Sequence, residues 1–136
     1  MLNVVLDTNI VLVSVSSHSP FHWVFQSLIE GKYSASVTSD ILFEYEEVLA
    51  EEMGISLAES AIETFDNLPN VQFVSEYFRW QLISADEDDN KFADCAIASN
   101  ADYIVTEDKH FNVLKRIKFP KVNVINLNQF KKLFNQ

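Results

Sequence analysis

Two short apolar runs, each ending in an acidic segment, constrain the fold of this chain more than any other feature. Residues 4–6 (Val-Val-Leu) lead into Asp7, and residues 103–105 (Tyr-Ile-Val) lead into Thr106-Glu107-Asp108. Continuous apolar runs of this kind are typical of strands buried on both faces of a parallel sheet. Open parallel sheets bind their ligands at the edge where the strands end. The two runs therefore predict a parallel sheet with carboxylates at its ligand-binding edge.

Helical and strand patterns alternate through the rest of the chain. Further strands are expected at residues 33–37, 71–74 and 122–125. Helices are expected at residues 19–31, 39–52, 56–67, 90–100, 109–116 and 128–134, with Ser19-Pro20 opening the first of them. The segment 77–83 fits a strand or an irregular stretch. This alternation predicts an α/β fold whose parallel sheet is covered on both faces, and we expect one domain over residues 1–136.

Composition and charge narrow the range of functions. The net charge of −10 opposes simple phosphate binding, although residues 91–136 hold eight of the ten basic residues. No apolar run approaches the roughly 18 residues of a membrane span, and the N-terminus lacks the basic segment of a secretory signal. The single cysteine, Cys95, is expected to be a packed core thiol. We therefore expect a cytoplasmic protein without a membrane partner.

Asp94 is the most unusual acidic residue because it lies in the middle of an apolar helix. An isolated buried carboxylate is costly, so it must be neutralised, paired or bound to a metal. Asn90 and Lys91 lie one turn earlier on the same helix face, and an ion pair with Lys91 is the alternative to a metal. The helix start points toward the ends of the strands, so Asp94 is expected to face Asp7 and Asp108.

These acidic residues together form a candidate metal site. Asp7 and Asp108 lie side by side if their strands are neighbours, although each alone also suits a helix N-cap. Glu44, in the first turns of its helix, is a fourth candidate, and taken alone it is more typical of a solvated helix residue. Several carboxylates at one site cannot all stay ionised without cations, and oxygen ligands select Mg²⁺ or Mn²⁺. Such ions can hydrolyse phosphodiesters.

Three segments resemble the PIN domain family of metal-dependent ribonucleases. "VVLDTNI" (residues 4–10) resembles the first strand and first acid of the family, and "SDILFEYEEVL" (39–49) resembles its helix with the second acid. "DEDDNKFADCAIASNADYIVTEDKHF" (86–111) resembles its most specific stretch, with the third and fourth acids on Asp94 and Asp108. The match runs nearly end to end, and the subgroup is similar to the toxin components of toxin–antitoxin pairs.

The resemblance implies a three-layer α/β/α fold in which the first strand is central and pairs with the 103–105 strand. It also implies hydrolysis of single-stranded RNA and an antitoxin protein as partner. The residues that it implies for catalysis and for Mg²⁺ or Mn²⁺ binding are Asp7, Glu44, Asp94 and Asp108. The supporting positions are Asn9, Asp89, Asn90 and Thr106, with Asp89 ranked below the four acids.

Substrate contacts are less well defined by the sequence. Lys91, Lys109 and His110 are candidates, although His110 is more typical of a polar residue at a helix start. The only plausible phosphate-contacting cluster is basic, and it serves equally well as solvated charge near helix ends; it consists of Lys109, Lys115, Arg116, Lys118 and Lys121. A homodimer face is compatible with the early aromatic residues, as is core packing; these are Phe21, Trp23 and Phe25.

Three other functions compete with the ribonuclease. A haloacid-dehalogenase-like phosphatase requires a second Asp two residues after the first, where this chain has Asn9. A receiver domain requires an Asp at the end of a middle strand, where Ser75-Glu76 follows the 71–74 segment. A non-catalytic binding module with the same fold is the stronger alternative, but it would carry buried carboxylates without using them.

Overall fold

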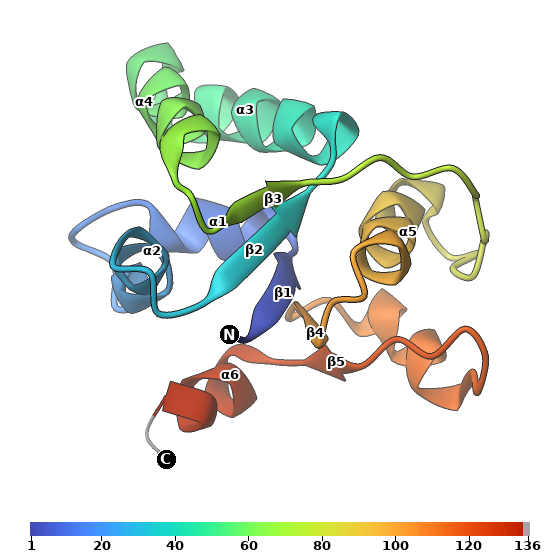
Figure 1. Cartoon of the computed structure of the whole chain (residues 1–136). Coiled ribbons are helices and arrows are strands. Elements are labelled where there is room, and N and C mark those ends of the chain that lie inside the picture. The colour runs from blue at the N-terminus through green and yellow to red at the C-terminus, as the bar shows by residue number, and fades with distance from the viewer. Residues whose placement is uncertain (135–136) are drawn as a thin grey trace.

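The computed structural model describes residues 1–134 and contains a five-stranded, all-parallel sheet in the order β3-β2-β1-β4-β5 (Figure 1). Its strands are β1 (Asn3–Leu6), β2 (Ser34–Val37), β3 (Val71–Phe73), β4 (Tyr103–Val105) and β5 (Val124–Ile125). The central strand β1 pairs with β2 on one side and β4 on the other. The predicted strands and the predicted adjacency of β1 and β4 are both confirmed.

Helices cover both faces of this sheet and make a three-layer α/β/α arrangement. Figure 1 shows α1 and α2 on one side of the strands and α5 on the other. The helices are α1 (Thr8–Ser14), α2 (His22–Ile29), α3 (Ser39–Met53), α4 (Ile55–Asn67), α5 (Asn90–Ala98) and α6 (Leu127–Phe134). There are also two 3₁₀ helices: η1 (Glu87–Asp89) directly precedes α5, and η2 (Lys109–Arg116) follows β4. Within residues 1–134, no helix has the length and apolarity needed to cross a membrane.

The aromatic residues of α2 belong mainly to the core. Trp23 packs on Phe130 of α6 with ring centroids 5.6 Å apart, and Phe25 lies 6.1 Å from Phe65 of α4. Phe21, which precedes α2, remains 38% exposed. Core packing therefore accounts for Trp23 and Phe25, two of the three aromatic residues that the sequence also allowed as a dimer face.

Helix α1 was not predicted from the sequence. It follows β1 directly, and Asp7 caps it by accepting a hydrogen bond from the Thr8 amide. Ser19-Pro20 does not start the next helix, because the Ser19 hydroxyl accepts the Phe21 amide in a turn and α2 begins only at His22. The short apolar stretch of α1 is compatible with either strand or helix, which explains why this helix was not predicted.

Residues 74–84, which we call the strap, form neither helix nor strand and run beside α5 (Figure 1). Two side chains of α5 hold the strap. The Asp94 carboxylate accepts the Trp80 amide at 3.1 Å, and the Asn90 side chain exchanges two hydrogen bonds with the Ile83 backbone, at 2.8 and 2.9 Å. Gln81 has φ of 53°, a left-handed conformation that interrupts a strand. Side chains of α5 thus make hydrogen bonds to the backbone of the strap that a neighbouring strand would make in a sheet.

Cys95 is fully buried in α5, as the sequence predicted. Burial raises the pKa of its thiol to about 12, with smaller contributions from the charges of Glu76 and Asp94. The nucleophilic form of cysteine is the thiolate, which is scarce at neutral pH for such a group. Cys95 is therefore a packing residue.

Candidate active site

Asp7 lies at the end of the central strand, where β1 passes into α1. Its Oδ1 accepts the Thr8 amide at 2.8 Å and its Oδ2 accepts the Thr106 hydroxyl at 2.7 Å. Burial raises the pKa of this carboxyl, and the charges of Asp108 and Glu44 raise it further, while the two hydrogen bonds lower it. Asp7 is thus fixed in orientation at a place where negative charge is already unfavourable.

Thr106 links the ends of β1 and β4. Its hydroxyl donates to Asp7 and also accepts the Asp108 amide at 2.9 Å. Asp108 in turn caps η2, because its Oδ1 accepts the His110 amide at 2.9 Å. One buried threonine hydroxyl therefore contacts the Asp7 carboxylate and the backbone amide of Asp108.

Asp89 lies at the junction of η1 and α5, and together with Asp7 and Asp108 it forms what we call the acidic cluster. It is 8% exposed. Burial raises its pKa to about 6, and the charges of Asp108, Asp86 and Asp7 act in the same direction, while His110 lowers the pKa. Within residues 1–134, its buried Oδ2 makes no hydrogen bond of standard geometry, and it lies 3.5 Å from His110 Nδ1. The sequence ranked Asp89 below four other acids, yet the structure places it with Asp7 and Asp108.

Asp94 does not face Asp7 and Asp108, and this corrects the expectation from the sequence. Its carboxylate accepts the Trp80 amide of the strap, and its pKa is raised by burial and lowered by that hydrogen bond and by the charge of Arg79. The burial of Asp94 is explained by its contact with the strap.

Helix geometry explains the different surroundings of Asp89 and Asp94. Asp94 lies five positions after Asp89, which corresponds to roughly 140° around the helix axis and about 7.5 Å along it. One helix start cannot present both side chains to the same group of acids. Burial in an apolar helix indicated that Asp94 needed a partner, but it could not indicate whether that partner was a cation or a backbone amide.

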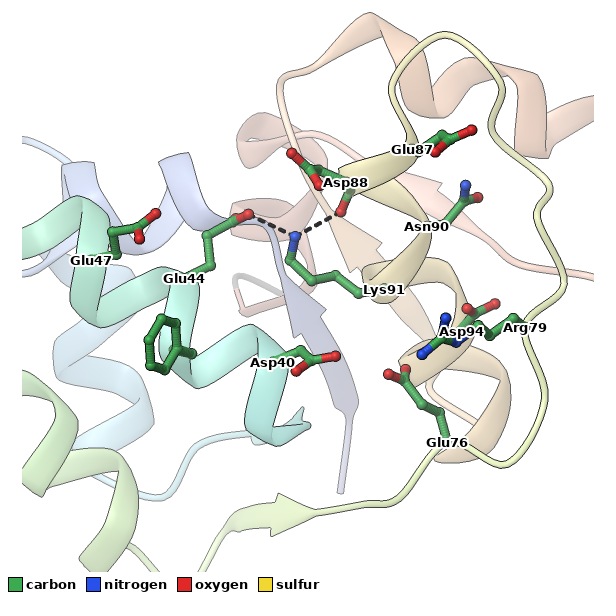
Figure 2. A pocket seen from close by; sticks show the side chains of 11 residues that line it. Asp40, Glu44, Glu47, Glu76, Arg79, Glu87, Asp88, Asn90, Lys91 and Asp94 are labelled. Carbon is green, nitrogen blue, oxygen red and sulfur yellow. Dashed lines mark hydrogen bonds and ion pairs between the residues drawn. The ribbon is translucent and has the colours of Figure 1, made fainter.

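Glu44 of α3 and Lys91 of α5 form an ion pair across the groove between these helices (Figure 2). Lys91 Nζ lies 2.7 Å from Glu44 Oε1 and donates to the Asp88 carbonyl at 2.8 Å. The Thr8 hydroxyl donates to the other Glu44 oxygen. The alternative that Lys91 pairs with Asp94 is therefore wrong. Glu44 joins the acidic cluster through Thr8 and through its charge, which raises the pKa of Asp7.

This groove has a mixed charge. Figure 2 shows Asp94 beside Arg79 and Glu76, while Lys91 reaches toward Glu44. The lining residues are Asp40, Phe43, Glu44, Glu47, Glu76, Arg79, Glu87, Asp88, Asn90, Lys91 and Asp94. The groove therefore runs from the neighbourhood of the acidic cluster to the strap.

His110 lies at the start of η2, as expected for a polar residue at a helix start, and its side chain also approaches the acidic cluster. Its Nδ1 is 3.5 Å from Asp89 Oδ2 and 3.6 Å from Asp108 Oδ1. Asp86, Asp89 and His110 each offer one atom within 4.8 Å of the others, a spacing that suits ligands of one metal ion. The sequence indicated Asp89 and His110 as secondary candidates and did not single out Asp86.

The remaining predicted residues lie around this cluster. Asn9 is exposed and lines a pocket with Phe21 and Leu127, and no hydrogen bond joins its side chain to the acids among residues 1–134. Asn90 holds the strap. All members of the predicted basic cluster are exposed: Lys109, Lys115, Arg116, Lys118 and Lys121. Thr8 was not predicted as a site residue, although its place directly after the first acid was a usable signal.

A model of the PIN domain family matches residues 3–110 of this chain. A search of curated protein sequences finds no match. Among solved structures, Rickettsia felis VapBC2 bound to a DNA fragment from its promoter is similar, with 20% identity, a TM-score of 0.63 and coverage of 92% of this chain and 98% of that chain. The Mycobacterium tuberculosis toxin VapC20, which cleaves the sarcin-ricin loop, has 14% identity and a TM-score of 0.59, covering 80% and 92%.

DNA-bound VapBC from Salmonella typhimurium has 14% identity and a TM-score of 0.58, with coverage of 93% of this chain and 98% of that chain. At these identities the solved structures bear on the fold, and they agree with the parallel five-stranded sheet flanked by helices. The family model covers far more than half of the sequence and includes every carboxylate of the cluster. The chain belongs to the PIN domain family.

Proposed function

We propose that this protein is a metal-dependent endoribonuclease whose reaction centre is the cluster of Asp7, Asp89 and Asp108, with Glu44 at its margin. The observation that carries the proposal is the mutual electrostatic effect of these acids. The charges of Asp108 and Asp7 raise the pKa of Asp89, and that of Asp108 raises the pKa of Asp7. Carboxylates that repel one another at a ligand-binding sheet edge are suited to a shared cation.

The chemistry of the donors fits a divalent metal ion. Within residues 1–134, the buried Asp89 Oδ2 makes no hydrogen bond of standard geometry and lies 3.5 Å from His110 Nδ1, so both atoms are available to a cation. Oxygen ligands favour Mg²⁺ or Mn²⁺, and the nearby His110 nitrogen favours Mn²⁺ of these two. When bound, such an ion supplies Lewis-acid activation of water and stabilises charge on a phosphodiester. Asp94 is not proposed as a ligand, because it is engaged with the strap.

The other residues of the site position the acids and the substrate. Thr106 keeps Asp7 and Asp108 in place by two hydrogen bonds. Lys91, paired with Glu44, presents an ammonium group that we assign to a phosphate oxygen of the substrate. The exposed Lys109 lies next to Asp108 and is assigned to a neighbouring phosphate. These cations offset part of the repulsion between an acidic protein and RNA.

The proposed biological role is that of a toxin restrained by an antitoxin protein. The fold neighbours include two VapBC assemblies and a toxin that cleaves the sarcin-ricin loop, which supports this assignment. Expression of the wild-type chain should then arrest growth, whereas an Asp7→Asn chain should not. Equal growth of both cultures would argue against the toxin role.

Cleavage of total cellular RNA by purified protein tests the enzymatic proposal. Wild-type protein should cut RNA with Mn²⁺ or Mg²⁺, and EDTA or the Asp7→Asn change should abolish the cuts. Sequencing of the new ends would define the target. Cleavage that persists in Asp7→Asn would contradict the site, and a wild-type protein that neither cuts RNA nor gains stability with Mn²⁺ would favour a binding module.

A further inference from the structure

Three aromatic rings form a contiguous ladder on the surface. Phe78 and Trp80 of the strap have ring centroids 4.7 Å apart, and Trp80 lies 6.2 Å from Phe119 in the η2–β5 connection. Phe78 is 62% exposed and Phe119 is 82% exposed. Trp80 is partly buried but does not pack against the hydrophobic core. Core packing therefore does not explain these rings.

The ladder is joined to the proposed reaction centre through α5. Asp94 and Asn90 anchor the strap to this helix, and Asp89 at the start of the same helix belongs to the acidic cluster. Arg79, between the first two rings in sequence, lines the groove that also contains Lys91 and Glu44. An RNA strand in this groove would pass Glu44 and Lys91 and reach Arg79, the residue between the first two rings in sequence.

The net negative charge of the protein favours contacts with RNA bases over contacts with phosphates at the three rings. A net charge of −10 weakens general attraction to the RNA backbone. Stacking on aromatic side chains does not depend on that attraction, and it is available to every unpaired base. Exposed cations alternate with the rings in sequence, Arg79 between Phe78 and Trp80, and Lys118 and Lys121 around Phe119. Aromatic rings interleaved with cations are suited to single-stranded nucleic acid.

We propose that Phe78, Trp80 and Phe119 form a platform on which unpaired bases of the RNA substrate stack beside the acidic cluster. This inference rests on the proposed ribonuclease function and identifies the single-stranded part of the substrate that the protein holds. The rings hold bases, while the cations beside them contact the adjoining phosphates.

Fluorescence anisotropy with a labelled uridine 12-mer tests the platform. The parent protein carries Asp89→Asn so that the probe is not cut. The double change Phe78→Ala and Phe119→Ala should weaken binding about tenfold or more. Phe73→Ala, which truncates a 54% exposed phenylalanine outside the ladder, is the matched control and should bind within about twofold of the parent. A probe with abasic sites should bind parent and double variant alike.

Tryptophan fluorescence gives a second readout that a merely structural role would not change. The chain has two tryptophans, so Trp23→Phe leaves Trp80 as the single emitter. The uridine 12-mer should quench Trp80, and the abasic probe should not. Absence of quenching, or binding of the double variant within twofold of the parent, would overturn the platform and leave the exposed rings to a protein partner.

Measurement of both RNA binding and RNA cleavage separates this inference from the proposed function. Metal-dependent cleavage by the wild type, with no effect of the ring changes on RNA binding, would overturn the platform alone. Ring-dependent binding without cleavage by the wild type would support the platform and overturn the ribonuclease. A parent protein that binds no RNA would overturn the platform.

Discussion

Two buried aspartates, one directly before helix α5 and one within it, have different surroundings. Asp89, just before its first residue, lies among other carboxylates and has a pKa of about 6; its buried Oδ2 lies 3.5 Å from His110 Nδ1 and makes no hydrogen bond of standard geometry within residues 1–134. Asp94, five residues later, accepts a backbone amide of the strap and is near Arg79. Both are buried and both have raised pKa values, so burial alone does not distinguish a ligand from a structural acceptor. The neighbouring groups make that distinction.

The difference separates two tasks on one helix. The face with Asp89 gathers negative charge that the protein does not neutralise by itself, which is suited to a metal site. The face with Asp94 satisfies a polar group of an irregular segment, which is suited to holding the strap in place. Changes on the first face should alter catalysis, and changes on the second should alter stability or RNA binding.

Apart from substitution of an acidic residue of the cluster, the largest loss of RNA cleavage is expected for Thr106→Val. Valine has nearly the shape of threonine but cannot donate to Asp7 or accept the Asp108 amide. We expect RNA cleavage to fall about 100-fold, because misplaced carboxylates lose transition-state stabilisation. Thr106→Ser retains the hydroxyl and should stay within a few-fold of wild type. Full activity of Thr106→Val would show that this link does not position the acids.

A somewhat smaller effect is expected for Lys91→Met. Methionine keeps much of the length of the side chain but removes the charge paired with Glu44. Cleavage should fall about 10- to 100-fold, because a cation aimed at the phosphate is lost. Lys32→Met, which removes a solvent-exposed charge that pairs with Glu30, should leave cleavage unchanged. Equal rates for both variants would exclude Lys91 from substrate binding.

On the other face of α5, Asn90→Ala should loosen the strap. The change leaves the Ile83 amide and carbonyl without their side-chain partner. Loss of these partly buried hydrogen bonds should lower the free energy of unfolding by about 1–2 kcal/mol, or roughly 4–7 °C in Tm. Limited proteolysis should cut the variant faster within residues 74–84. Unchanged Tm and proteolysis would contradict the anchoring role.

The smallest effect concerns the pH dependence of the metal-free protein. Asp89 has a folded-state pKa of about 6, above its ordinary 3.8. The folded state holds this proton more tightly, so its stabilising contribution is present below about pH 4 and is lost as the pH rises through 6. Asp89→Asn should therefore raise Tm at pH 7.5 by about 3 °C. Mn²⁺ should raise Tm of the wild type more than that of the variant. A lower Tm for Asp89→Asn than for the wild type at pH 7.5 would contradict the electrostatic repulsion between Asp89 and the neighbouring carboxylates.

The sequence was sufficient for the sheet because β1 and β4 are continuous apolar runs that end in acidic segments, and because the other strands alternate with helical patterns. It was sufficient for Asp7 and Asp108 because neighbouring parallel strands end at one edge. It did not predict the contact of Asp94 with the strap, because an apolar helix can bury a carboxylate for a metal or for an amide donor. It also underrated Asp89, which stands in a run of acids that is typical of a solvated loop. Only the path of the strap and the rotation of α5 distinguish these two residues.

The most direct test is a comparison of Asp89→Asn with Asp94→Asn, two changes that remove the same charge from the same helix. Asparagine at position 94 still offers an oxygen to the Trp80 amide. RNA cleavage with Mn²⁺ should fall about 1,000-fold in Asp89→Asn, and Asp94→Asn should keep a rate within about threefold of wild type. Loss of cleavage in Asp94→Asn, with cleavage retained in Asp89→Asn, would contradict the assignment and restore Asp94 as the third acid.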